Sequence, residues 1–404
     1  MKKIFIHIIC FFVMSAGLFS QEEEDKTYLL SIGNESLKNK VMEIAPGKIY
    51  ETRNGEPISF GKMIQKMKNS RYIYLGETHD SLPMHNIQQQ IIQALVIKYR
   101  RVAVGLEMFL SQQQQVLNKW SLGLLTEEEF IHESRWYVTW NFHFEYYAPV
   151  FRLAREWKIP LYGLNVERDI ISKIRMRGWD SLLPEEKGKV PKPDLSHEEH
   201  RKLIRTIFEN SDLPPQMKGR GLDMMFEGLY RAQSAWDEVM AANAVKAAEI
   251  EGTKLVVLAG SGHMIYNLGI NRRVWERDSQ PFSTVICVNV PADQEKIRVS
   301  RSLGDFIWCL SAEERPAFPA AGLRLKNVAG LDNLVIREKA LSGAAKNTDF
   351  QKGDVILSVD DKPFSDINNL RFYLSRFTWG DSVVFKILRN GDEREVRLNY
   401  VQGK

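Results

Sequence analysis

Apolar residues between positions 71 and 310 come in short runs that alternate with longer amphipathic stretches. The runs are rich in β-branched or aromatic residues and end at or near a glycine, as in Tyr72–Leu75 and Leu255–Ala259. They lack the alternation of a half-exposed strand, which is typical of parallel strands covered by helices on both faces. We therefore expect an α/β domain with a mainly parallel sheet flanked by helices. The expected strands lie near 71–77, 101–107, 160–165, 254–260, 283–290 and 305–310.

The stretch between the third and fourth expected strands is too long for one crossover connection. Residues 185–250 carry helical signals, including Ser196-His197-Glu198-Glu199, which has the form of a capping box. We expect an inserted helical subdomain there that could roof a pocket. His197 and His200 have the spacing of two metal ligands on a helix, but we expect both to be solvent-exposed.

Polar residues follow several of the expected strands directly. Gly76-Glu77-Thr78-His79 ends the first run, Glu107 ends the second, and Gly260-Ser261-Gly262-His263 ends the fourth. In open α/β sheets, ligand and catalytic groups collect just beyond the carboxyl ends of the strands. Although a single such residue is more often a helix cap, several at one edge predict a polar pocket. The residues expected there are Glu77, His79, Glu107 and His263, and His85 could join them.

Composition sets the broad class of the protein. The 404 residues are 44% hydrophobic and 26% charged, which is ordinary for a globular protein, and they suffice for two or three domains. The net charge of +4 is small and no Lys/Arg block forms a phosphate-tracking stripe, so we expect no nucleic-acid partner.

The N-terminus has the features of a secretory signal. Met1-Lys2-Lys3 precedes an apolar run, Ile4–Leu18, that is too short to span a membrane. We expect a cleavable signal peptide over 1–20, export to the periplasm or the medium, and no transmembrane helix in the mature chain. Export permits a disulfide between Cys287 and Cys309, but their apolar surroundings favour buried free thiols.

The first domain, residues 21–310, resembles the ChaN-like family of the haem-binding uptake and Tiki superfamily. Besides the two Gly-x-x-His motifs, the resemblance rests on Gly105–Phe109, Trp136…Trp140 with Tyr147-Ala148-Pro149, Asn165–Arg168 and Ala232–Asp237. It implies an exported protein tied to haem or iron handling. The metal-dependent proteases of the wider superfamily use paired Gly-x-x-His motifs and carboxylates. The resemblance therefore implies a catalytic role for Glu77, His79, Glu107 and His263.

After a linker over 311–317, residues 318–402 resemble a PDZ domain of the bacterial protease-associated kind. The resemblance rests on Ser342–Ala345, Phe350–Asp360 and Val383–Gly391, in which Asn390-Gly391 is a hairpin turn. It implies a module that recruits protein and takes no part in the chemistry of the first domain. An extended peptide would add to the strand that follows the carboxylate loop. The expected peptide-binding residues are Gly322, Leu323, Arg324 and Leu325.

Three functions remain open at this point. In the first, the protein binds haem against the aromatic run 136–147, with Tyr137, His143 or Tyr147 as cofactor-binding residues. In the second, it is a metal-dependent hydrolase or peptidase. There Glu77, His79, Glu107 and His263, with His85, hold a divalent ion such as Zn²⁺ or Mn²⁺. In the third, it is an envelope scaffold in which only the PDZ domain binds. The assembly is undetermined, with room for a homodimer.

Overall fold

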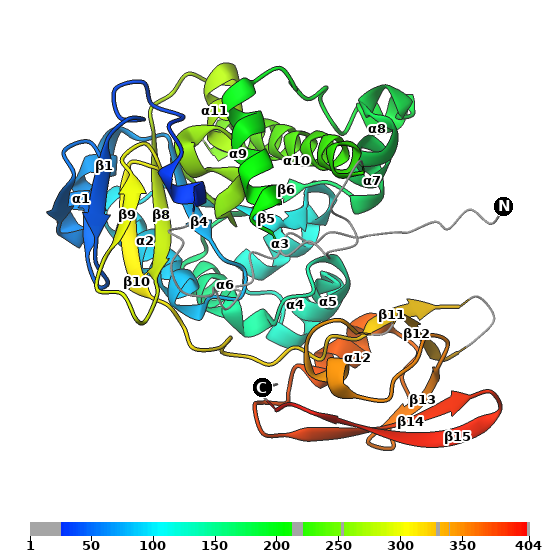
Figure 1. Ribbon diagram of the computed structural model, residues 1–404. Coiled ribbons are helices and arrows are strands. Elements are labelled where there is room, and N and C mark those ends of the chain that lie inside the picture. The colour runs from blue at the N-terminus through cyan, green and yellow to red at the C-terminus, as the bar shows by residue number, and fades with distance from the viewer. Residues whose placement is uncertain (1–25, 212–220, 252–253, 329–331, 339, 402–404) are drawn as a thin grey trace.

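An eight-stranded sheet forms the centre of the first domain (Figure 1). Six adjacent strands are parallel and reach one edge of the sheet, and an antiparallel hairpin forms the other edge. In sheet order the strands are β3 (Glu56–Ile58), β2 (Ile49–Glu51), β10 (Phe306–Ser311), β8 (Phe282–Val290), β4 (Tyr72–Glu77), β7 (Lys254–Gly260), β5 (Val102–Leu110) and β6 (Leu161–Asn165). All six parallel strands match the predicted positions, so the predicted fold class is confirmed.

The computed structural model describes residues 26–211, 221–251, 254–328, 332–338 and 340–401. The expected signal peptide, 1–20, lies outside these residues. None of the helices that the structure describes is both long enough and apolar enough to cross a membrane.

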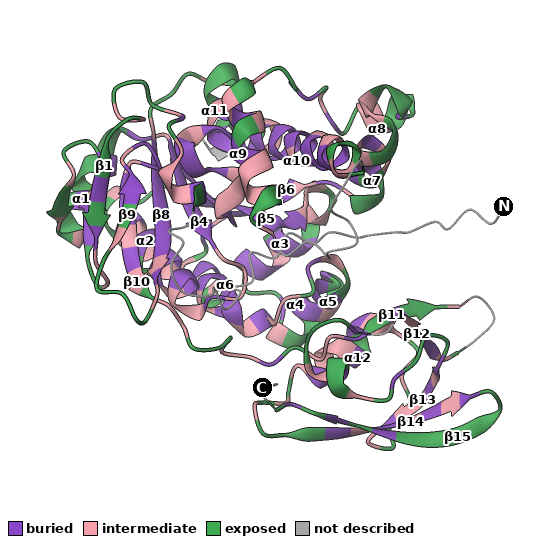
Figure 2. Cartoon of the chain, viewed as in Figure 1, coloured by how far each residue is buried: buried purple, intermediate pink, exposed green. Residues whose placement is uncertain are grey.

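The middle strands are buried on both faces because helices cover each side of the sheet (Figure 2). Along β4, Ile73 and Leu75 enter one apolar core, whereas Tyr72 and Tyr74 enter the other. This two-sided burial explains the continuous apolar runs in the sequence. The first core is covered by α1 (Phe60–Lys66), α2 (Leu82–Tyr99), α3 (Gln114–Ser121), α4 (Glu127–Glu133), α5 (Trp136–Thr139) and α6 (Ala148–Trp157). The second is covered by α9 (Glu198–Glu209), α10 (Leu222–Glu251) and α11 (Ile270–Arg277).

Within 185–250 the described residues include the helices α9 and α10, and α10 packs directly on the sheet as one of its covering layers. Beside it lie α7 (Arg168–Arg177) and α8 (Pro184–Lys187). The expected capping box at Ser196 is wrong by one residue: His197 is the N-cap of α9, and its side chain accepts from the amide of His200. The expected exposure of His200 is also wrong, because that side chain is fully buried.

Cys287 and Cys309 are free. They lie on adjacent strands, β8 and β10, but Cys287 enters the first core and Cys309 the second. Their side chains therefore point to opposite faces of the sheet, which prevents a disulfide without refolding one strand.

Four short strands have no counterpart in the sequence analysis. The edge hairpin of β2 and β3 is one pair. The other pair is β1 (Val41–Ile44) and β9 (Ile297–Ser300), which form a separate two-stranded antiparallel sheet.

The C-terminal domain is a five-stranded antiparallel sheet with its own apolar core. Its elements are β11 (Arg324–Asn327), β12 (Leu334–Glu338), β13 (Val355–Val359), α12 (Ile367–Leu374), β14 (Ser382–Arg389) and β15 (Asp392–Asn399). β11 is an edge strand, as peptide addition requires. Gly322 precedes it with φ +76°, and a Cβ there would lie 2.0 Å from the carbonyl oxygen of Ser342. Only glycine fits this loop.

A tight approach between β5 and β6 gives a test of the fold. A Cβ on Gly163 would lie 2.2 Å from the carbonyl oxygen of Leu110, which is rigid backbone. We expect Gly163→Ala to lower the free energy of unfolding by about 1–3 kcal/mol or more, measured by chemical denaturation. The matched control is Gly61→Ala in α1, where a Cβ meets nothing within 4 Å. Equal stability of the two variants would contradict the packing described here.

Candidate functional site

The carboxyl ends of β4, β5 and β7 place two Glu–His pairs side by side. Glu77 ends β4 and His79 follows two residues later, with Nδ1 of the imidazole 2.9 Å from Glu77 Oε1. Glu107 lies in β5, and His263 follows β7, with its Nε2 3.4 Å from Glu107 Oε1. The pairs meet at Gly260, where a Cβ would lie 3.0 Å from His79 Cε1 and 3.7 Å from Glu107 Oε2. The structure thus brings the four predicted residues together.

Glu77 is held from three further directions. It accepts a 2.6 Å hydrogen bond from the hydroxyl of Tyr147 and a 2.8 Å bond from Nε2 of Gln88. His85, also fully buried, lies 3.3 Å from Glu77 Oε2 and donates from Nδ1 to Gln88 Oε1, so it joins the site as a support of the carboxylate. Burial alone would raise the pKa of Glu77, but the His85 and His79 imidazoles outweigh it and lower this pKa to about 2.

His263 is enclosed by two carboxylates. Asp237, a fully buried residue of α10, lies 2.5 Å from its Nδ1, while Glu107 faces its Nε2. Burial lowers the pKa of His263, but Glu107 and Asp237 more than reverse this and raise it to about 10. Their own pKa values are lowered, because the imidazolium outweighs the effect of burial on each carboxyl. The pKa of His79 is raised as well, because Glu77 and Glu107 overcome the effect of burial on it. Near neutral pH His263 is therefore a cation between two carboxylates.

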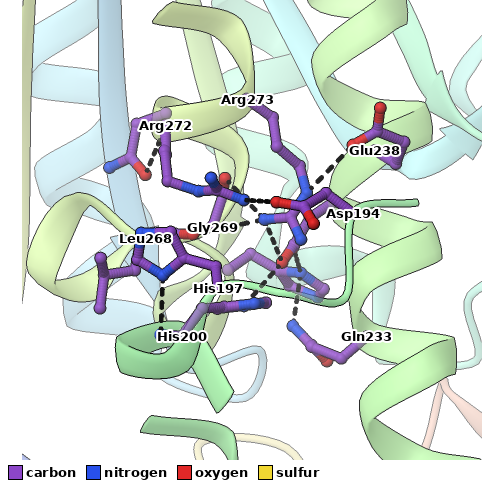
Figure 3. A network of polar contacts seen from close by, with 12 residues as sticks. Asp194, His197, His200, Gln233, Glu238, Leu268, Gly269, Arg272 and Arg273 are labelled. Atoms are coloured by element: carbon purple, nitrogen blue, oxygen red, sulfur yellow. Dashed lines mark hydrogen bonds and ion pairs between the residues drawn. The ribbon is translucent and has the colours of Figure 1, made fainter. Parts of the chain in front are cut away.

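Behind Asp237 lies a second polar layer, part of which Figure 3 shows with side chains from α9, α10 and α11 pointing toward one another. His200 Nε2 lies 3.2 Å from Asp237 Oδ2, and Arg273 Nη1 lies 3.6 Å from the same oxygen. Arg273 is fully buried and also donates to Glu238, at 3.1 Å, and to backbone carbonyls of the loop before α11. Burial lowers the pKa of His200 to about 4, so this imidazole is neutral and Asp237 keeps its charge for His263 and Arg273.

A pocket opens over the two imidazoles. Its polar floor comes from the strand ends, and its apolar wall comes from α9 and α10. The empty space is about 620 Å³, a volume that includes open solvent at the mouth of the pocket. The lining residues are Glu77, Thr78, His79, Ile204, Ile207, Leu229, Gln233, Gly260, Ser261, Gly262 and His263.

The three aromatic-run residues proposed for haem lie outside this lining. Tyr147 is buried and donates to Glu77, and the hydroxyl of Tyr137 accepts from the amide of Phe144. His143 donates from Nε2 to the carbonyl of Ser375 and accepts at Nδ1 from the amide of Glu145. Among the described residues, no group of three or more His, Cys, Asp or Glu side chains is arranged to hold a metal ion.

A family model described as "Haem-binding uptake, Tiki superfamily, ChaN" matches residues 63–274, which is more than half of the chain. The chain belongs to this ChaN family. A second model, for the PDZ domain, matches residues 319–400. Both resemblances seen in the sequence are thereby confirmed, and the ChaN match spans every residue of the pocket.

Solved structures agree with the ChaN assignment at the level of the fold. A structure of ChaN from Campylobacter jejuni with cofacially bound haem is 21% identical, with a TM-score of 0.51, and the match covers 64% of this chain and 95% of that one. An HtrA-type protease, AlgW, with a decapeptide is 23% identical over 20% of this chain and 28% of its own, with a TM-score of 0.19. An erythromycin esterase, EreC, in its open conformation is 12% identical over 66% and 98%, with a TM-score of 0.41. These last two likenesses are too low to carry an argument. A comparison with curated proteins finds no match.

Sequence reasoning missed the groups that hold the ChaN-family motifs in place: Asp237, Gln88, His200 and Arg273. Asp237 stands at the end of Ala232–Asp237, one of the segments that carry the resemblance, so that segment did point to it. Gln88 lies in α2, the helix directly after β4, whereas His200 and Arg273 meet Asp237 from other helices.

Because Asp237 and Glu107 enclose His263, we expect the imidazole of His263 to titrate differently in the variant Asp237→Asn. Removing one of two carboxylates should lower the pKa of His263 from about 10 toward 6.5, measured by NMR titration of its ring protons. A pKa raised in the folded state stabilises the fold fully below pH 6.5, and this contribution is lost as the pH rises through about 10. The free energy of unfolding of the unaltered protein should therefore fall over that range, with a smaller slope in the variant.

The control for this titration is Asp223→Asn, an exposed carboxylate on the same helix that pairs with Arg205. It should leave the titration of His263 unchanged. If His263 titrates alike in all three proteins, Asp237 does not hold its proton.

Proposed function

We propose that the first domain binds haem in the pocket over His79. The apolar wall of Ile204, Ile207 and Leu229 offers a surface for the macrocycle, opposite the imidazoles of the floor. Membership of a family described by haem-binding uptake supports the same ligand. Haem or haem-derived iron is then the cargo of the protein.

His79 is the observation that carries this proposal. Its Nδ1 is engaged by Glu77, and its Nε2 lies on the side of Gly260, another residue of the pocket lining, 3.3 Å from where a Cβ on that glycine would stand. Imidazoles that bind a metal commonly donate their other ring N–H to a carboxylate, which fixes the ring and raises its basicity. Glu77 is itself fixed by Tyr147 and Gln88, so the ring is oriented before a ligand arrives.

The location of the protein and the role of its PDZ domain are proposed from the sequence. Export through a signal peptide over 1–20 would place the pocket outside the cytoplasm, where haem is captured. The PDZ domain would bring a protein partner to β11 through Gly322–Leu325.

Haemin titration tests the ligand directly. The unaltered protein should shift the Soret band of haemin, and His79→Ala should weaken binding by at least about tenfold, because the iron loses its protein ligand. The control is His197→Asn, which keeps a side-chain acceptor at the N-terminus of α9 and should bind haemin normally.

Two outcomes would count against His79. A spectrum that stays that of free haemin would remove haem as the ligand of this protein. A normal spectrum in His79→Ala together with a lost shift in His143→Ala or Tyr147→Phe would move the iron to the aromatic run.

Hydrolysis is the second candidate function, and the ionisation of the site favours it. Protonated His263 beside ionised Glu107 provides an acid and a base within one pocket. On this proposal Glu107 would activate water and His263 would protonate the leaving group. Turnover of a chromogenic ester or of casein by the unaltered protein, lost in Glu107→Gln, would support hydrolysis. No turnover by either protein would reject it.

A further inference from the structure

The PDZ helix α12 packs on the aromatic run of the first domain. Asn368 Oδ1 accepts from the backbone N–H of Tyr137 at 3.0 Å, and Arg371 donates to the carbonyl of the same residue at 2.7 Å. The ring of Phe372 lies 6.2 Å from the ring of Tyr137, and His143 donates to the carbonyl of Ser375 at the end of the helix. One face of α12 is therefore committed to the first domain, as Figure 1 shows for α12 beneath α5.

This contact supports a helix that is too short to be stable alone. α5 has only four residues, and its N-cap, Arg135, has a left-handed backbone with φ 49° and no capping hydrogen bond from its side chain. Isolated helical turns are unfavourable in water because nucleation costs more entropy than one hydrogen bond returns. Asn368 satisfies an N-terminal amide of α5 from the other domain, so it acts as an N-cap in trans.

The other side of the same segment forms the wall behind His79. The Trp140 ring stands edge-on to the His79 ring with centroids 4.8 Å apart, and Phe142 lies 5.0 Å away. Trp140 follows α5 directly, and its amide donates to the carbonyl of Trp136. The segment 136–142 thus has α12 on one side and the candidate iron ligand on the other.

We propose that Asn368 and Arg371 are positioning residues for the pocket, acting through Tyr137 and Trp140. The docked PDZ helix holds the aromatic wall against His79, so ligand affinity in the first domain depends on the position of α12. Because coupling between sites is reciprocal, a peptide that shifts α12 when it binds beside β11 changes the affinity of the pocket. The haem readout below rests on the proposed function, whereas the exchange readout does not.

Full-length Arg371→Ala tests the coupling. Arg371 is not part of the apolar PDZ core, so the domain should stay folded. We expect amide hydrogen exchange to accelerate in 136–142 and in 77–81, and haemin affinity to fall by at least about fivefold, the low end of measured couplings. Arg394→Ala is the matched control, since that exposed side chain lies on β15 and pairs with Asp392 of the same strand. It should change neither readout.

A second pair of variants tests whether the effect comes from the docking of α12 and not from the Arg371 side chain alone. Asn368→Ala removes the side chain that accepts from the backbone N–H of Tyr137 in α5. The neighbouring Asn369 is exposed to solvent, so Asn369→Ala is the control. Faster exchange at 77–81 in both Arg371→Ala and Asn368→Ala would establish the coupling even if the unaltered protein bound no haemin. Exchange that accelerates only within 136–142, with exchange at 77–81 and haemin affinity unchanged, would overturn it.

Discussion

The ion pairing of buried carboxylates with buried imidazoles is the constraint on which the site depends. The side chain of Glu77 and that of Asp237 are fully buried, and an unpaired charge there would cost several kcal/mol. Each is instead faced by an imidazole, and Glu107 is shared by His263 and the amide of Gly260. Removing one partner from such a pair typically lowers the free energy of unfolding by about 3–5 kcal/mol. The paired groups of the site therefore depend on one another for the stability of the fold.

The same pairing joins elements that are far apart in the sequence. Asp237 binds α10 to the loop after β7, and His200 and Arg273 bring α9 and α11 to the same carboxylate. Because α9 also carries Ile204 and Ile207, the apolar wall of the pocket is positioned by the polar layer behind it. A chain of contacts then runs from His79 through Trp140 and α5 to the PDZ helix.

The strand ends were predictable because two-sided burial leaves a local signature of continuous apolar runs. Glu77, His79, Glu107 and His263 stand directly after such runs, so topology alone places them at one edge. β3 escaped prediction because it is three residues long and contains Pro57, which suits only an edge strand. The burial of His200 depends on Asp237, and the docking of α12 depends on Tyr137. No local pattern encodes these pairings, which arise only when distant elements meet.

A structure of the full chain with haemin bound would show directly which side chain holds the iron. We expect iron bound to Nε2 of His79, with Glu77 still hydrogen-bonded to Nδ1 and the macrocycle against Ile204, Ile207 and Leu229. Iron bound to His143 or to a tyrosine of the run 136–147, or haem outside the pocket with His79 still paired only to carboxylates, would contradict it.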